Sequence, residues 1–419
     1  MISETFLRVL KWRMSLMKYS AFTFISWDNK TNRMAQKKSI FSICNCCYLI
    51  TYLYCVSLVA TYFATGFIST ESESGIEDIF DEDYQPRDEE LATLCGLAHL
   101  MYACASVGLV GNLYVLLLTK RKTFVDFVTV SIDNSFQNQE KYKELLEGNP
   151  EAKRIQTLCE CIIFLVAAAT VVTPFIYGTV IFHEFCPEHQ ILIRLFEIKV
   201  KPEWKFVPLW LYVNYMVLQC CDLVFILDIG GILYLNNCIT WFRLLRPVAL
   251  KTSRESPKFL CNLGCTLDKN EVIMTYKKQQ LLHSRYNSIF ANNLITGHHA
   301  TFLYISAIGL YICIRNWGNI YKPEYFMAIL GPFFCILAER IEVNFVEDVI
   351  AKSSDYLYAL DSLMKTENWR LKGLRKHWES LHVLEPKLAY PYYNLTYENF
   401  LLFLNEIVDK VVFLLVCLE

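Results

Sequence analysis

Residues 400–419, near one end of the chain, read FLLFLNEIVDKVVFLLVCLE and decide the expected fold. A helix of about 20 residues rises about 30 Å, which is the thickness of the hydrocarbon core of a membrane. Because most of the stretch is apolar, we predict that it forms a helix that crosses a membrane.

Several residues of this stretch share one helical face. They are separated by steps of four, three, four and three, and such steps keep residues on one side of a helix. The residues are Asn405, Asp409, Val412, Val416 and Glu419. An acid that faces lipid is costly, so Asp409 is expected to face protein or water. Two interpretations stay open: Asp409 pairs with a neighbouring helix or with Lys410, or the face lines a water-filled pore.

The composition of the whole chain favours a membrane protein with several spans. Of the 419 residues, 54% are hydrophobic and only 20% are charged, and the mean hydropathy is +0.27. Soluble domains contain about 45–50% apolar residues. The formal net charge of −2 argues against a nucleic-acid partner.

The distribution of charge orients the chain in the membrane. Residues 1–38 carry eight basic and two acidic residues, whereas residues 69–90 carry ten acidic residues and one basic residue. Because Lys and Arg gather on the cytoplasmic side, we predict a cytoplasmic N-terminus and an acidic outer loop over residues 69–90. Seven spans then place the C-terminus outside the cell. The spans are expected at about 40–67, 91–119, 158–182, 206–235, 294–314, 325–345 and 400–418.

A cytoplasmic helical segment is expected over residues 346–399, before the last span. The sixth apolar run is short, and a helical pattern continues beyond it through residues 339–345, so this helix should leave the membrane rather than end there. Apolar residues at Trp369, Leu374 and Trp378 predict further helix up to Pro386. The predicted fold class is therefore all-α, a single seven-transmembrane helical bundle with a cytoplasmic anchor segment.

Two acids, Asp222 and Asp228, lie in the predicted fourth span beside the pair Gly230-Gly231. Acids inside a span are costly unless they are paired or wet. We favour a long helix that emerges early into the cytoplasm over the alternative of a buried polar network.

The 17 cysteines are expected to be free thiols, because nearly all lie in apolar runs or in predicted cytosolic loops. The spacing Cys261-x3-Cys265 is compatible with metal binding, but no His or Cys at ligand spacing completes a zinc set. The pair His298-His299, with Glu339 on the next predicted span, comes nearest to a catalytic set. We predict no catalytic residue, no metal site and no cofactor, and we do not expect an enzyme.

Aromatic side chains gather in the outer halves of three predicted spans. Pockets for small molecules are mostly apolar and aromatic, with few polar anchors. Aromatic residues also pack in cores and line membrane interfaces, and this alternative stays open. The candidate ligand-binding residues are Phe175, Tyr177, His183, Trp210, Tyr212, Tyr215 and Tyr311.

This architecture resembles the insect-type gustatory and odorant receptor superfamily over the whole chain. The best local matches are residues 371–386, with Arg375, Trp378 and Leu381, and the polar-then-apolar last helix. The chain departs from the gustatory pattern in residues 411–419, where the Thr-Tyr and Gln-Phe landmarks of the family are missing. Glu419 lies near the position where the family has the Gln.

The resemblance implies a ligand-gated, non-selective cation channel of the plasma membrane, a homo- or hetero-tetramer that responds to a small-molecule tastant or odorant. The gustatory type is favoured, and the last helix would line the pore. Four copies of its polar face would then form a ring of Glu419 at the outer mouth, a constriction at Val412 and Val416, and a ring of Asp409 further in.

Two other classes of protein are weighed. A G-protein-coupled receptor also has seven spans, but its N-terminus lies outside the cell and its C-terminus in the cytosol. The charge bias of this chain predicts the reverse orientation. A transporter would show matching halves with broken helices, and none are visible in the sequence.

Overall fold

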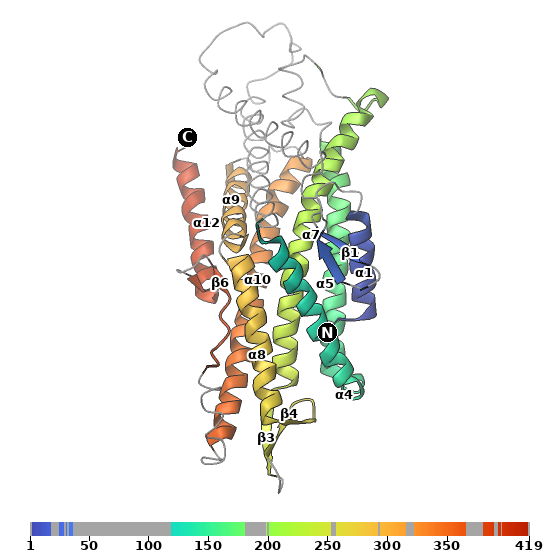
Figure 1. The fold of residues 1–419 in the computed structure, drawn as a ribbon. Coiled ribbons are helices and arrows are strands. Elements are labelled where there is room, and N and C mark those ends of the chain that lie inside the picture. Colours follow the sequence, from blue (N-terminus) through green and yellow to red (C-terminus); the bar gives the residue numbers. More distant parts are fainter. Residues whose placement is uncertain are drawn as a thin grey trace.

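The structure is a computed structural model, and it describes residues 2–17, 25–28, 31, 33–36, 119–180, 198, 201–252, 257–291, 294–315, 322–365, 380–388, 393–394 and 396–417. The predicted first span, the acidic loop and all but the last residue of the predicted second span lie outside these residues. Long helices that run alongside one another dominate the described part (Figure 1).

The helices pack in one row of neighbours, with α1 against α5 at one side and α12 against α9 at the other (Figure 1). Between them α5 packs on α7, α7 on α10 and α10 on α9. The bounds are α1 Glu4–Leu16, α4 Lys143–Glu147, α5 Pro150–Val180, α7 Val207–Leu244, α8 Lys269–Tyr286, α9 Leu294–Arg315, α10 Lys322–Lys365 and α12 Tyr397–Cys417. Residues 119–141 form a further helix, Trp204–Phe206 a 3-10 turn and Asn287–Ala291 a π-helical turn.

Helices occupy the described parts of the predicted spans. Within the described residues, one helix, Pro150–Phe175 in α5, is long and apolar enough to cross a membrane by length and composition, and a shorter apolar helix covers His299–Arg315. α10 confirms the expectation that the sixth run continues as a helix, since it extends without a break to Lys365.

The all-α expectation needs one addition, because three small antiparallel sheets accompany the helices. A capping box joins the largest sheet to α8: Asp268 accepts from the Glu271 backbone N–H (2.7 Å), and the Glu271 carboxylate accepts from the Asp268 N–H (3.0 Å). Such caps satisfy the free N–H groups at a helix start. The strands are β1 Ile25–Asp28 with β2 Arg33–Gln36, β3 Pro247–Thr252 with β4 Pro257–Cys261 and β5 Thr266–Asp268, and β6 Lys387–Leu388 with β7 Tyr393–Asn394.

The centre of the bundle is a stack of buried aromatic rings. Tyr286 lies between Tyr234 of α7 and Phe290, with centroid distances of 4.0 and 4.7 Å. Gly230 allows this packing, because a Cβ at that position would lie 2.8 Å from the Phe290 ring and 3.0 Å from Phe124. The glycine noted in the sequence therefore serves close packing of the rings.

The N-terminal segment forms α1, which packs against α5 through its buried face. Ser3 caps the helix by accepting from the Phe6 N–H at 2.9 Å. Phe6, Leu10 and Met14 are spaced by four and are buried, and Arg13 on the same face is buried as well.

For Asp222 the structure supports the alternative of a buried polar network. α7 does extend to Leu244, but Asp222 is buried and forms an ion pair with Arg13 of α1. The Arg13 Nε also donates to Thr170 of α5 (3.3 Å), and its guanidinium lies 5.2 Å from the Phe225 ring centroid. A partner from a distant segment satisfies this acid, which a local sequence pattern does not reveal.

The segment before α12 also differs from the expected anchor helix. α10 ends at Lys365, and residues 381–386 are not helical. Side chains of neighbouring helices bind this backbone instead: the Tyr276 hydroxyl donates to the His382 carbonyl (2.7 Å), and the Leu384 N–H donates to Ser353 Oγ (3.0 Å). Trp369, Leu374 and Trp378 lie outside the described residues.

Candidate functional site

α12 packs on α9 and α10 through one apolar face. The members of this face are spaced by three or four residues and are buried, which is the pattern of a helix seated on a core. They are Phe400, Phe403, Ile407 and Val411. Leu414 continues the packing, against the α9 cluster of Tyr311, Ile312 and Cys313.

The predicted pore-lining residues lie on the opposite face of α12. Asn405, Asp409, Val412 and Val416 are all exposed, with 52% exposure at Val412 and 68% at Val416. At about 100° per residue, the centre of this group lies close to half a turn from the centre of the buried face. Glu419, the fifth predicted member, lies outside the described residues. We call the four described residues the polar stripe.

The two polar members of the stripe contact each other. The Asn405 side-chain amide donates to the Asp409 carboxylate at 3.4 Å, one helical turn away. The two exposed valines follow on the C-terminal side. The stripe is therefore polar in the first half of α12 and apolar in the second.

Glu398 extends this stripe, and reasoning from the sequence missed it. It lies seven residues before Asn405, which is about two helical turns, and it is exposed. The signal was present in the spacing, but the predicted span began at residue 400 and so left Glu398 out.

Charged side chains of α10 contact the N-terminal end of α12. The Arg340 guanidinium lies 4.5 Å from the ring centroid of Tyr397 and 5.3 Å from that of Phe400. The Glu347 carboxylate accepts from the Tyr397 N–H at 2.6 Å, which satisfies a free N–H group in the first turn of α12. These contacts attach the start of α12 to α10.

His299, one member of the histidine pair noted in the sequence, lies close to the same helix. His299 Nδ1 of α9 lies 2.8 Å from Glu339 Oε1 of α10, and the His299 ring lies 4.8 Å from the Phe403 ring centroid. The expected proximity of Glu339 is confirmed for His299. The two side chains join α9, α10 and α12 at one point.

The predicted ligand-binding residues fall in two places. Phe175 on α5 and Tyr212 and Tyr215 on α7 are exposed, while Trp210 is partly buried. Tyr311 is 2% exposed and belongs to the cluster with Leu414 of α12. The side chains of Tyr177 and His183 lie outside the description. The pocket stays a prediction.

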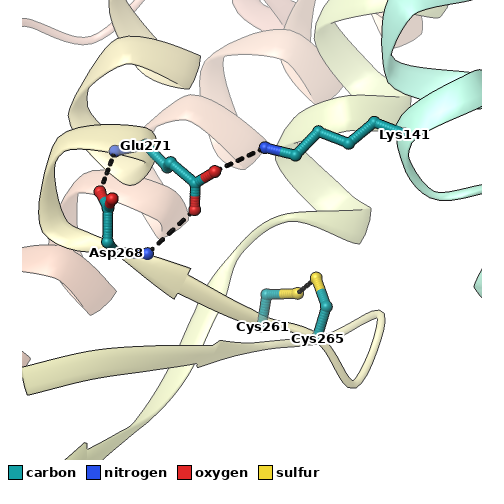
Figure 2. A network of polar contacts seen from close by, with 5 residues as sticks. All are labelled: Lys141, Cys261, Cys265, Asp268 and Glu271. Carbon is teal, nitrogen blue, oxygen red and sulfur yellow. Dashed lines mark hydrogen bonds and ion pairs between the residues drawn. The ribbon is translucent and has the colours of Figure 1, made fainter.

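The two cysteines of the Cys261-x3-Cys265 motif meet at the tip of the β4–β5 hairpin. Their sulfurs lie 2.9 Å apart, close to the capping box of α8 and to the ion pair of Lys141 with Glu271 (Figure 2). Both are free thiols. Within the described part of the chain, no group of three or more His, Cys, Asp or Glu side chains is arranged to hold a metal ion.

The overall fold is similar to that of solved insect olfactory receptors. One is the structure of OR5 from Machilis hrabei in complex with eugenol, with a TM-score of 0.57, 11% sequence identity, and coverage of 98% of this chain and 97% of that one. Another is OR5 from Machilis hrabei, with a TM-score of 0.54, 10% identity, and coverage of 97% and 96%.

No protein-family model and no curated protein matches the sequence. At this identity the structural likeness concerns the fold, and it extends over nearly the whole length of both chains. The class defined by the architecture is therefore the helical fold of the insect olfactory receptors.

Proposed function

We propose that this chain is a divergent member of the insect odorant and gustatory receptor superfamily. In this proposal it is a multi-pass protein of the plasma membrane that acts as a chemosensory receptor and a ligand-gated, non-selective cation channel. The fold supports this proposal together with the expectation of seven spans. The observation that carries the channel is the polar stripe of α12.

The stripe supports a pore because its two polar side chains would be costly on a lipid-facing surface. The apolar face of α12 is already buried on α9 and α10. A side that faced lipid would be apolar, whereas this side carries Asn405 and Asp409. A tetramer around a central axis would turn the four stripes toward a common water-filled path.

The order of residues along the stripe suits cation conduction. Acidic rings attract cations, and an apolar constriction gates by losing its water. The Asp409 ring would supply the charge, and Val412 and Val416 would supply the constriction. A second acidic ring at Glu419 belongs to the same proposal.

The ligand is proposed to be a small organic molecule, a tastant or an odorant. One similar structure is described as a complex with eugenol. The proposed contact residues are the aromatic set named from the sequence. Tyr311 is of special interest because it belongs to the α9 cluster against which Leu414 of α12 packs, so a ligand near it would lie close to the proposed pore helix.

The test is a charge reversal on the stripe with a matched control. The Asp409→Lys variant is expected to shift the reversal potential toward anion permeability, because it turns an acidic ring basic. Glu406→Lys makes the same charge change on an exposed position of α12, about a quarter turn from the centre of the stripe. It is expected to leave the reversal potential near that of the parent chain.

Whole-cell currents are measured in cells that express the chain alone or with candidate partner subunits, after surface labelling confirms delivery. A shift with Glu406→Lys and none with Asp409→Lys would show that another face lines the pore. The channel proposal fails if the surface-delivered protein conducts no current with any of the ligands and partner subunits tested.

A further inference from the structure

The Cys261–Cys265 pair lies in a tight turn that aims both sulfurs at one point. Cys261 is the last residue of β4, and Cys265 directly precedes β5. The Cys261 N–H donates to the Cys265 carbonyl (3.0 Å), and the Gly264 N–H donates to the Cys261 carbonyl (2.9 Å). Gly264 has φ +83°, a conformation that favours glycine. The backbone therefore holds the sulfurs at 2.9 Å.

Hydrogen bonds to backbone carbonyls at the end of α7 anchor this turn. The Asn262 N–H donates to the Arg246 carbonyl (3.0 Å), and the Leu263 N–H donates to the Leu244 carbonyl (3.0 Å). The Asn262 side-chain amide also donates to the Arg243 carbonyl at 2.8 Å. The approach of the two sulfurs is thus a property of an anchored loop.

The two thiols differ in exposure and in acidity. Cys261 is 2% exposed, while Cys265 is partly exposed. The hydrogen bond between the two sulfurs lowers the pKa of the Cys261 thiol to about 6, and the same interaction, with burial, raises the pKa of Cys265. The pair therefore shares one proton near neutral pH, and thiolate is the reactive form of cysteine.

We propose that Cys261 and Cys265 form a reversible dithiol–disulfide site that reacts with a low-molecular-weight disulfide such as glutathione disulfide. A disulfide needs a sulfur–sulfur distance of about 2.05 Å, so the sulfurs need to approach by less than about 1 Å. The hairpin belongs to a loop predicted to face the cytosol, where the pair is expected to rest as a dithiol. The site is independent of the proposed channel activity.

The reaction proceeds by two thiol–disulfide exchanges. Cys265, the more accessible sulfur, passes its proton to Cys261 and attacks glutathione disulfide, which forms a Cys265–glutathione bond and releases one glutathione thiolate. Cys261 then loses its proton to solvent and attacks the Cys265 sulfur, which releases the second glutathione. The cysteine pair loses two electrons and its one shared proton, while glutathione disulfide gains two electrons, takes up this proton and one more from solvent, and becomes two molecules of glutathione.

The sequence offers a clean readout of this reaction. Trypsin cleaves after Lys258 and Lys269, so residues 259–269 form one peptide that contains these two cysteines and no other. The purified full-length chain is equilibrated with glutathione buffers of increasing disulfide content and quenched with acid. Free thiols are then alkylated, the disulfides are reduced, and the released thiols are alkylated with a heavy-isotope reagent. Mass spectrometry reads both positions.

In the parent chain both cysteines are expected to be oxidised together with one midpoint, and the unreduced peptide is lighter by two hydrogens. In Cys261→Ser, Cys265 is expected to stop at the mixed disulfide with glutathione, because no second sulfur remains to displace the bound glutathione. In Cys265→Ser, the buried Cys261 is expected to stay reduced.

Cys265→Ala repeats the second test without a hydroxyl, and gel filtration shows whether each variant stays folded. The proposal is overturned if the two cysteines of the parent chain become oxidised independently of each other, with different midpoints. It is also overturned if the parent peptide carries glutathione without an internal disulfide across the whole series of buffers. Neither result depends on a variant.

Discussion

Asp222 and Asp409 are both acids in apolar helices, but they differ in burial and in pairing. Asp222 on α7 is buried and pairs with Arg13, whereas Asp409 on α12 is exposed, and among the described residues the contact found for it is Asn405. A buried charged acid is strongly destabilising unless a partner compensates its charge. An exposed acid on a helix of this kind needs water or another subunit. The difference separates an acid that stabilises the fold from one that is available for function.

The largest expected effect tests the first half of this comparison. Asp222→Ala leaves the Arg13 charge buried and unpaired, so the free energy of unfolding in detergent is expected to fall by about 3–5 kcal/mol. The measurement is a denaturant titration of the purified protein. The double variant Arg13→Met with Asp222→Leu is expected to recover most of the loss, because no buried charge remains.

Asp409→Ala is the matched control, since it removes the same group from an exposed site. It is expected to change the free energy of unfolding by less than about 0.5 kcal/mol. Equal losses for Asp222→Ala and Asp409→Ala would show that the two acids are not used differently.

A change in basal current, of intermediate size, is expected at the two valines of the stripe, Val412 and Val416. Val416→Ser adds a hydroxyl to the proposed constriction, so water should enter it more readily and the basal current should rise severalfold. Leu414→Ser changes a residue that packs against the cluster of Tyr311, Ile312 and Cys313, and it is expected to reduce the amount of folded protein without raising the current per surface-delivered channel. A higher basal current in Leu414→Ser alone would move the gate to the packing face.

The smallest effect is expected at an exposed ion pair, Lys141 with Glu271 (2.7 Å; Figure 2). Lys141→Met is expected to lower the free energy of unfolding by about 0.2–1 kcal/mol, because water screens this pair. The hydrogen bond with Glu271 raises the pKa of Lys141 above its ordinary value of 10.5. The contribution of the pair is therefore complete below pH 10.5 and is lost as the pH rises through the higher pKa of the folded state.

Denaturant titrations of the parent chain and of Lys141→Met at pH 8 and at pH values above 10.5 measure this difference. The gap between the two proteins should narrow at the higher pH values. A gap that widens there would contradict the direction of the shift, and a loss as large as that of Asp222→Ala would remove the contrast between buried and exposed pairs.

Patterns within single helices could be predicted from the sequence. The spacing of Asn405, Asp409, Val412 and Val416 predicts one face, and the structure leaves that face exposed. The long apolar run with its polar continuation predicts that α10 extends beyond the sixth span, and it does so. Such periodicity depends on local geometry, because side chains three or four positions apart share a side of any α-helix.

Contacts between distant segments could not be predicted in this way. The sequence shows Asp222 but not Arg13 beside it, and it shows Cys261 and Cys265 but not the anchored turn that brings their sulfurs to 2.9 Å. It predicts a helix up to Pro386, whereas Tyr276 and Ser353 bind the backbone of this segment in a non-helical form. Each outcome depends on which partner lies opposite.

The sequence by itself therefore determined the helical class, the apolar and polar faces of α12, and the charge bias along the chain, because these follow from the order of neighbouring residues. The tertiary structure alone decided which acid is paired, which face of α12 is covered by α9 and α10, and which thiols meet. The physical reason is that burial and pairing depend on the surroundings that the packed helices create, and residues far apart in the chain build those surroundings together.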